Sequence, residues 1–107
     1  MTIRTKPRRR TTITDEMLEK LSRTIVRRRH KVEVVRARFG ITVFESGTGA
    51  PIARLNPVPG TDRFTVRWWS GFRGRWMQAE GLGDAVMTID EAGPCISKDA
   101  TFWISIE

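Results

Sequence analysis

The sequence has very little of the residues that build disulfides and metal centres. Among 107 residues there is one cysteine, Cys95, and one histidine, His30. An internal disulfide is therefore excluded, and a structural zinc site, which takes about four nitrogen or sulfur ligands, cannot be assembled within one chain. A catalytic dyad would have to pair these two residues, and we interpret them instead as an inert thiol and a solvated imidazole. We expect no metal and no cofactor.

Motifs of nucleotide-binding enzymes and of membrane proteins are also missing. There is no Gly-x-x-x-x-Gly-Lys and no Gly-x-Gly-x-x-Gly sequence. No apolar run approaches the roughly 20 residues that span a bilayer. The first residues lack the apolar core of a secretory signal, and Pro7 argues against a transit peptide. Carboxylates such as Glu45 and Glu80 are scattered, as on a solvated surface. We expect a non-enzymatic cytoplasmic protein without a membrane partner.

Positive charge is concentrated at the start of the chain. The formal net charge is +7, from 19 Lys and Arg against 12 Asp and Glu. Residues 1–13 hold five of the cations and no acid. We predict that they form a flexible basic arm, because like charges repel and apolar residues are sparse there. The remainder, 14–107, is nearly balanced in charge and is predicted to be a single α+β domain.

An N-terminal helix is predicted over 14–30. Thr14 is a typical N-cap residue, and the two acids that follow it suit the positive end of the helix dipole. One apolar stripe recurs at helical spacing: Met17, Leu18, Leu21 and Ile25. The cationic run 27–31 (Arg-Arg-Arg-His-Lys) would then close the helix at its carbonyl-rich end.

Five short strands are predicted after the helix, over 32–39, 41–45, 51–55, 63–69 and 75–80. Their alternation and brief Gly- and Pro-containing connections favour an antiparallel meander, and the helix is expected to cover one face of this curved sheet. Thr88 and Glu91 form a capping box that opens a second helix, which Gly93 and Pro94 should stop within about a turn. The alternating residues 102–106 indicate a final strand or an extended segment docked on the core.

The aromatic residues concentrate in the predicted hairpin over 63–80, which holds three of the four tryptophans. Trp68 and Trp76 are predicted to face the core. Trp69 falls on the opposite face beside Arg67, where nucleobases can stack on it; stacking of arginine on tryptophan within the protein is the alternative. Phe72 is expected at the exposed loop tip, where an aromatic side chain has little structural purpose and can contact a partner.

The helix, the meander and the double tryptophan together resemble a family of small bacterial domains of unknown function. The resemblance depends on the segments Phe-Gly-Ile-Thr-Val-Phe-Glu (39–45), Pro-Ile-Ala-Arg (51–54), Phe-Thr-Val-Arg-Trp-Trp (64–69), Gly-Arg-Trp (74–76) and Phe-Trp (102–103). It covers about residues 14–106 and leaves the basic arm outside. It implies the same α+β fold, and the family has no established activity that could be carried over.

Two functions fit these features. In the first, the protein binds nucleic acid: the arm and the run 27–31 contact phosphates, while the hairpin supplies stacking and further charge. Helix-end electrostatics and a solubilising tail are the structural alternatives for those two basic segments. The candidate nucleic-acid-binding residues are Arg4, Lys6, Arg8, Arg9, Arg10, Arg27, Arg28, Arg29, Lys31, Arg67, Trp69, Phe72, Arg73 and Arg75.

In the second hypothesis the protein is a protein-binding adaptor or inhibitor module. The exposed aromatic hairpin would then act as a hot spot, since tryptophan and arginine are enriched in such spots, and the charge of the arm would steer association. An exposed sheet edge can pair two copies of the chain. We therefore expect a monomer or a weak homodimer.

Overall fold

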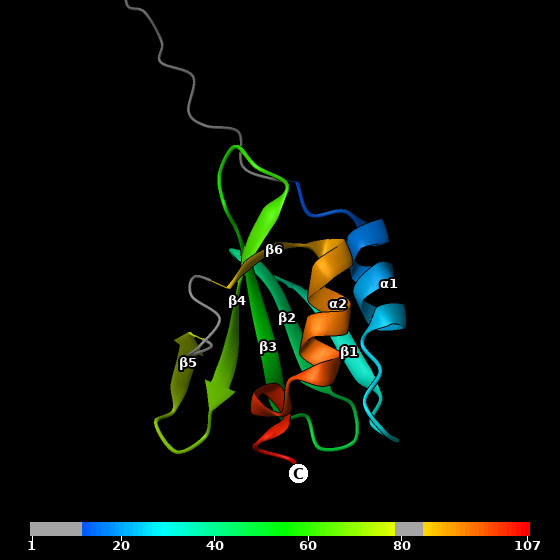
Figure 1. Cartoon of the computed structure of the whole chain (residues 1–107), viewed down its shortest axis with the longest axis vertical. Coiled ribbons are helices and arrows are strands. Elements are labelled where there is room, and N and C mark those ends of the chain that lie inside the picture. Colours follow the sequence, from blue (N-terminus) through cyan, green and yellow to red (C-terminus); the bar gives the residue numbers. More distant parts are fainter. Residues whose placement is uncertain (1–11, 79–84) are drawn as a thin grey trace, which may run out of the picture.

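The computed structural model describes residues 12–78 and 85–107 (Figure 1). The described elements are, in chain order, α1 (Asp15–Thr24), β1 (Val32–Ala37), β2 (Gly40–Glu45), β3 (Pro51–Pro57), β4 (Arg63–Ser70), β5 (Arg75–Gln78), β6 (Val86–Thr88), α2 (Ile89–Lys98) and the 3-10 helix η1 (Ala100–Trp103). The predicted α+β class is confirmed, as is the order of an N-terminal helix followed by an antiparallel meander.

The strands form one antiparallel sheet in the order β1-β2-β3-β4-β5, and β6 also pairs with β4. Strand β5 pairs with residues 67–70 of β4, and β6 pairs with residues 63–65. Both short strands therefore lie along the same edge of β4. The sequence did not predict β6, because three residues are too few to show a period.

Helix α1 begins where the sequence predicted, with the Thr14 hydroxyl accepting a hydrogen bond from the Met17 N–H (3.3 Å). It ends at Thr24, so the prediction of a helix over 14–30 was wrong at its C-terminal end. Ile25 is already extended, and Arg28 has a positive φ of 52°. The cationic run therefore lies in a tight turn after the helix.

The early end of α1 has a tertiary cause. The Ser97 hydroxyl of α2 accepts a hydrogen bond from the Val26 N–H (2.7 Å) and lies 3.1 Å from the Thr24 carbonyl oxygen, to which it can donate. These bonds replace partners that another helical turn would supply. Residues 24–26 are also all β-branched, which lowers helix propensity.

Helix α2 begins with the predicted capping box, in which the Thr88 hydroxyl accepts from the Glu91 N–H. It then continues through Gly93 and Pro94 to Lys98, so the prediction that it stops within about a turn was wrong. Pro94 removes one backbone donor, but it lies on the exposed side of the helix, where water can satisfy the free carbonyl.

The chain after α2 forms η1 and a final turn, and the predicted last strand is absent from the described residues 99–107. The Asp99 carboxylate accepts a hydrogen bond from the Thr101 N–H (3.0 Å) and so starts the 3-10 helix. Both aromatic residues of η1, Phe102 and Trp103, are buried. Burial of this aromatic pair, rather than strand pairing, holds the segment on the core.

The core lies between the sheet and a layer made by α1, α2 and η1, and Figure 1 shows both α-helices on the same side of the sheet. Its buried residues are Leu21, Ile25, Ile41, Val43, Ile52, Ala53, Leu55, Phe64, Val66, Ala85, Ile89, Ala92, Ile96, Phe102 and Trp103. Within the described residues, no helix covers the opposite face of the sheet, as predicted.

Candidate nucleic-acid interface

The uncovered face of the sheet is called the open face below. Side chains alternate along a strand, so the partners of core residues point away from the helices. By this alternation and the strand register, the open face of β2 to β5 is made by Thr42, Phe44, Arg54, Asn56, Thr65, Arg67, Trp69, Trp76 and Gln78. Arginine and tryptophan are thus concentrated on β3, β4 and β5.

Two tryptophans lie side by side on the open face. Trp69 and Trp76 are directly opposite each other on β4 and β5, and their rings meet edge to face with centroids 5.2 Å apart. Both side chains are half-buried. Trp68 packs against the core as predicted, whereas the prediction that Trp76 also faces the core was wrong. The turn of the hairpin pairs Trp76 with Trp69 and thereby places it on the opposite face.

Two arginines also face each other across neighbouring strands. Arg54 of β3 is the direct partner of Arg67 of β4, which brings two like charges together in an arrangement that is normally destabilising. Neither side chain forms a hydrogen bond or an ion pair with any described residue. The Nε atom of Arg67 is buried without a hydrogen-bond partner. Among the residues that the structure describes, the arginine pair is therefore a site of positive charge without a compensating carboxylate.

Sequence reasoning found Arg67 and Trp69 but missed Arg54 and Trp76. The missing signal was strand register, because two arginines separated by a loop in sequence become neighbours only once the pairing of β3 with β4 is fixed. The alternation of β4 alone placed Arg67 and Trp69 together correctly.

The β4–β5 hairpin tip is strongly exposed, as predicted. Phe72 is 100% exposed, and Arg73 and Arg75 are also exposed. Beside the tip lies a shallow groove lined by Trp68, Ser70, Gly71, Phe72, Ile104 and Ser105. Ile104 is itself 61% exposed. The tip thus offers an apolar patch next to cations.

The residues of the cationic run differ in how far they are engaged with the rest of the protein. The Arg27 guanidinium donates two hydrogen bonds to the Glu107 carboxylate, from Nε (3.1 Å) and from an Nη atom (2.8 Å). The same bonds hold the pKa of Glu107 below its ordinary value. Arg28, Arg29 and Lys31 are exposed. The structure therefore gives Arg27 an intramolecular carboxylate partner.

The described candidate residues lie in two segments, the turn at 27–31 and the β4–β5 hairpin. In Figure 1 the turn at 27–31, the β4–β5 hairpin and the C-terminus lie at the lower end of the molecule. The described chain begins at Thr12, which belongs to the predicted arm 1–13. The candidates Arg4, Lys6, Arg8, Arg9 and Arg10 are outside the described residues.

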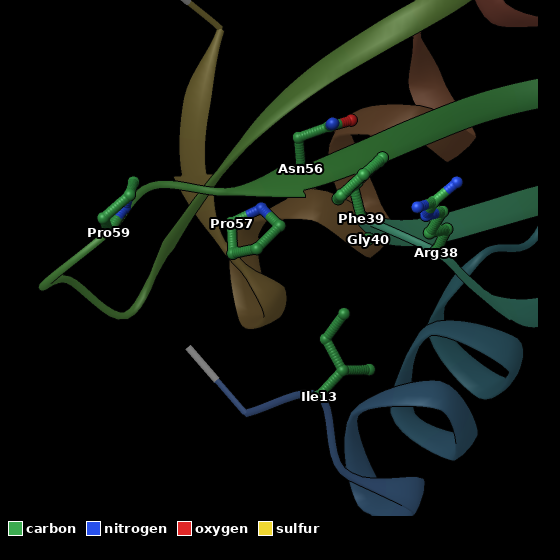
Figure 2. Close-up of a pocket in the computed structure, with 7 residues that line it drawn as sticks. All are labelled: Ile13, Arg38, Phe39, Gly40, Asn56, Pro57 and Pro59. Atoms are coloured by element: carbon green, nitrogen blue, oxygen red, sulfur yellow. The ribbon is translucent and has the colours of Figure 1, made fainter. Parts of the chain in front are cut away.

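A pocket of about 300 Å³ lies at the end of the sheet where α1 begins (Figure 2). It is lined by Ile13, Arg38, Phe39, Gly40, Asn56, Pro57 and Pro59. In Figure 2, Ile13 projects from below toward the space between Pro57 and Phe39. The Arg38 guanidinium lies 5.2 Å from the centre of the Phe39 ring. The described lining residues include no carboxylate, imidazole, thiol or hydroxyl, and so offer no group for acid–base or nucleophilic chemistry.

Comparisons with protein-family models, with curated proteins and with solved structures find no match to this chain. They neither support nor contradict the resemblance to small bacterial domains. Within residues 12–78 and 85–107, no helix is long and apolar enough to cross a membrane. The same residues contain no group of three or more His, Cys, Asp and Glu side chains that could hold a metal ion.

Proposed function

We propose that the protein binds single-stranded nucleic acid on the open face of its sheet. The observation that carries this proposal is the arginine pair Arg54 and Arg67, which has no ion-pair partner in 12–78 and 85–107, beside the tryptophan pair Trp69 and Trp76. A nucleotide carries a phosphate and a nucleobase, and the open face presents a partner for each. The protein is accordingly proposed to be a binding protein and not an enzyme.

The arginine pair supplies the electrostatic part of binding. A phosphate placed between Arg54 and Arg67 would relieve the repulsion between them, and guanidinium groups bind phosphate oxygens in a two-pronged manner. Neutralising phosphates releases counterions, which makes the affinity fall steeply with salt. The exposed hairpin residues Arg73 and Arg75 add further positive charge near the tip.

The tryptophan pair supplies the stacking part. In a duplex the bases are stacked on one another, whereas unpaired bases are free to stack on an aromatic side chain, for about 1–3 kcal/mol per base. Every base has a π face, so such stacking is tolerant of sequence. The proposed ligand is therefore single-stranded, and it is bound with weak sequence selectivity.

The test is fluorescence anisotropy with labelled oligo-dT, oligo-U and a DNA duplex at several salt concentrations. Arg67→Gln should weaken binding of the single strands about tenfold and reduce the log–log salt slope by about 0.7, the loss of one phosphate contact. Trp69→Ala should also weaken binding about tenfold through lost stacking. Arg23→Gln is the matched control, since it removes one exposed cation from α1 on the other side of the molecule. Equal affinities for Arg67→Gln and Arg23→Gln would refute the proposed site.

A second candidate function is protein binding at the hairpin tip. The observation that favours it is the full exposure of Phe72 next to Ile104, because an apolar patch of this kind marks interaction sites. An aromatic protein interface should depend weakly on salt. Two results together would favour this function over the first. The wild-type protein would not bind oligonucleotides at physiological salt, and Phe72→Ala would abolish binding of a protein partner.

A further inference from the structure

The carboxylate of Glu107 lies in an anion-binding site made by Arg27 and His30. Arg27 holds both of its oxygens, and the His30 Nε2 atom lies 3.3 Å from one of them. The side chains of Arg27 and Glu107 are only 16% and 18% exposed. The two residues come from segments 80 positions apart in the sequence. This contact is called the Glu107 clasp below.

Arg27 and His30 also make contacts that do not involve Glu107. An Nη atom of Arg27 donates a hydrogen bond to the Ser97 carbonyl oxygen (3.3 Å). The His30 ring stacks on Trp103, with centroids 5.4 Å apart. Trp103 is buried and donates from its indole N–H to the Ile96 carbonyl (2.7 Å). Each of the two side chains therefore has a contact that does not depend on the carboxylate.

The clasp has more positive charge than one carboxylate neutralises. The Arg28 Nε atom is 4.0 Å from the same carboxylate, and its side chain is 73% exposed. Arg29 and Lys31 are exposed in the same turn. Asp99 adds a weaker attraction to Arg27 from farther away. The turn thus remains cationic even with Glu107 in place.

We propose that Arg27, Arg28 and His30 form a phosphate-binding site and that Glu107 is its intramolecular competitor. A phosphate presents two oxygens to a guanidinium as a carboxylate does, and it carries a third oxygen for a further donor. Glu107 is tethered to the core and competes at a high effective concentration, so a free anion displaces it poorly. A nucleic-acid strand that is held on the open face and extends to the turn at 27–31 is tethered as well. Its phosphates can therefore displace the Glu107 carboxylate. The inference rests on the proposed function for the identity of this ligand.

The first experiment repeats the oligo-dT titrations with Glu107→Ala. Releasing the site should raise affinity about tenfold and steepen the salt slope by about 0.7 for one added phosphate contact. Glu19→Ala is the matched control, because Glu19 is an exposed acid on α1 that pairs with no described residue, and its removal changes net charge equally. Adding Arg27→Gln to Glu107→Ala should return the affinity to that of Glu19→Ala. Equal gains for Glu107→Ala and Glu19→Ala would overturn the inference.

A second experiment separates failure of the clasp from failure of the proposed function. Pyrophosphate is titrated into Glu107→Ala while the Arg27 Nε–Hε and His30 ring signals are followed by NMR. Shifts that saturate, and that are absent in the Glu107→Ala/Arg27→Gln variant, support the site even if no oligonucleotide binds the open face. Signals that do not move would overturn the site, whatever the open face binds. The NMR spectrum itself reports whether each variant is folded.

Discussion

Replacing Gly93 by alanine tests whether the two helices are in close contact. Gly93 is buried in α2 where this helix meets the end of α1. A Cβ atom added there would lie 1.9 Å from the Thr24 Oγ1 atom and 2.6 Å from its Cβ atom. Rotation of the Thr24 side chain can move Oγ1 but leaves Cβ in place. The helices must therefore move apart.

Two effects of opposite sign set the size of the change. Alanine in place of glycine inside a helix stabilises it by about 1 kcal/mol. Overpacking a core typically costs about 1–3 kcal/mol, and a contact of 2.6 Å between two Cβ atoms belongs at the upper end. The expected net loss is about 2 kcal/mol, which for a domain of this size lowers Tm by about 8 °C. Helix propensity alone predicts the opposite sign.

The assay is thermal unfolding followed by circular dichroism. Gly71→Ala is the control, because a Cβ there meets only Ser105 Oγ at an ordinary 3.5 Å. In a Thr24→Gly background, Gly93→Ala should no longer destabilise, since the nearest remaining atom is a backbone carbon at 3.4 Å. A rise in Tm for Gly93→Ala in the wild-type background would refute the close contact of the helices.

Three further predictions concern single sites. Hydrogen bonds from the backbone N–H groups of the loop after β2 lower the pKa of Glu45 in the folded protein. The contribution of Glu45 to stability is therefore present above the unfolded pKa of about 4.3, and it is lost as pH falls through the lower folded pKa. The Tm of Glu45→Gln should accordingly be below that of the wild type at pH 7 and fall less steeply in acid, whereas the exposed control Glu33→Gln should keep the wild-type profile. Burial raises the pKa of the Cys95 thiol, and iodoacetamide should label it at pH 8 at least about tenfold more slowly in the native protein than in denaturant; equal rates would contradict its burial. Gly40→Ala places a Cβ 2.1 Å from the Leu55 carbonyl oxygen, and it should lower Tm in thermal unfolding by at least as much as Gly93→Ala, because a backbone atom in the sheet cannot rotate away.

Much of the fold followed from local patterns. Thr14 and Thr88 predicted both helix starts, because capping depends on residues within one turn. Alternation in β4 placed Trp68 on the core and Trp69 on the open face. These predictions needed only neighbours in sequence, and all of them were confirmed.

The errors occurred where distant segments decide the local structure. Helix α1 ends at Thr24 because Ser97, far away in the sequence, supplies hydrogen bonds there. Gly93 looked like a helix stop, yet it allows α2 to approach α1. For the candidate site, pairing of Arg54 with Arg67 and of Arg27 with Glu107 joins residues whose contact no local pattern contains.

The packing of α1 against α2 has a consequence for the order in which the protein can fold during synthesis. Helix α1 is made before the sheet, whereas α2 and η1, which share the core with Leu21 and Ile25, are made after it. The β1–β4 meander has mostly short-range pairing and can form in between. A nascent chain ending before α2 therefore carries an apolar helix stripe and an uncovered core face of the sheet. Such surfaces are what chaperones bind, and synthesis of α2 and η1 is the step that closes them.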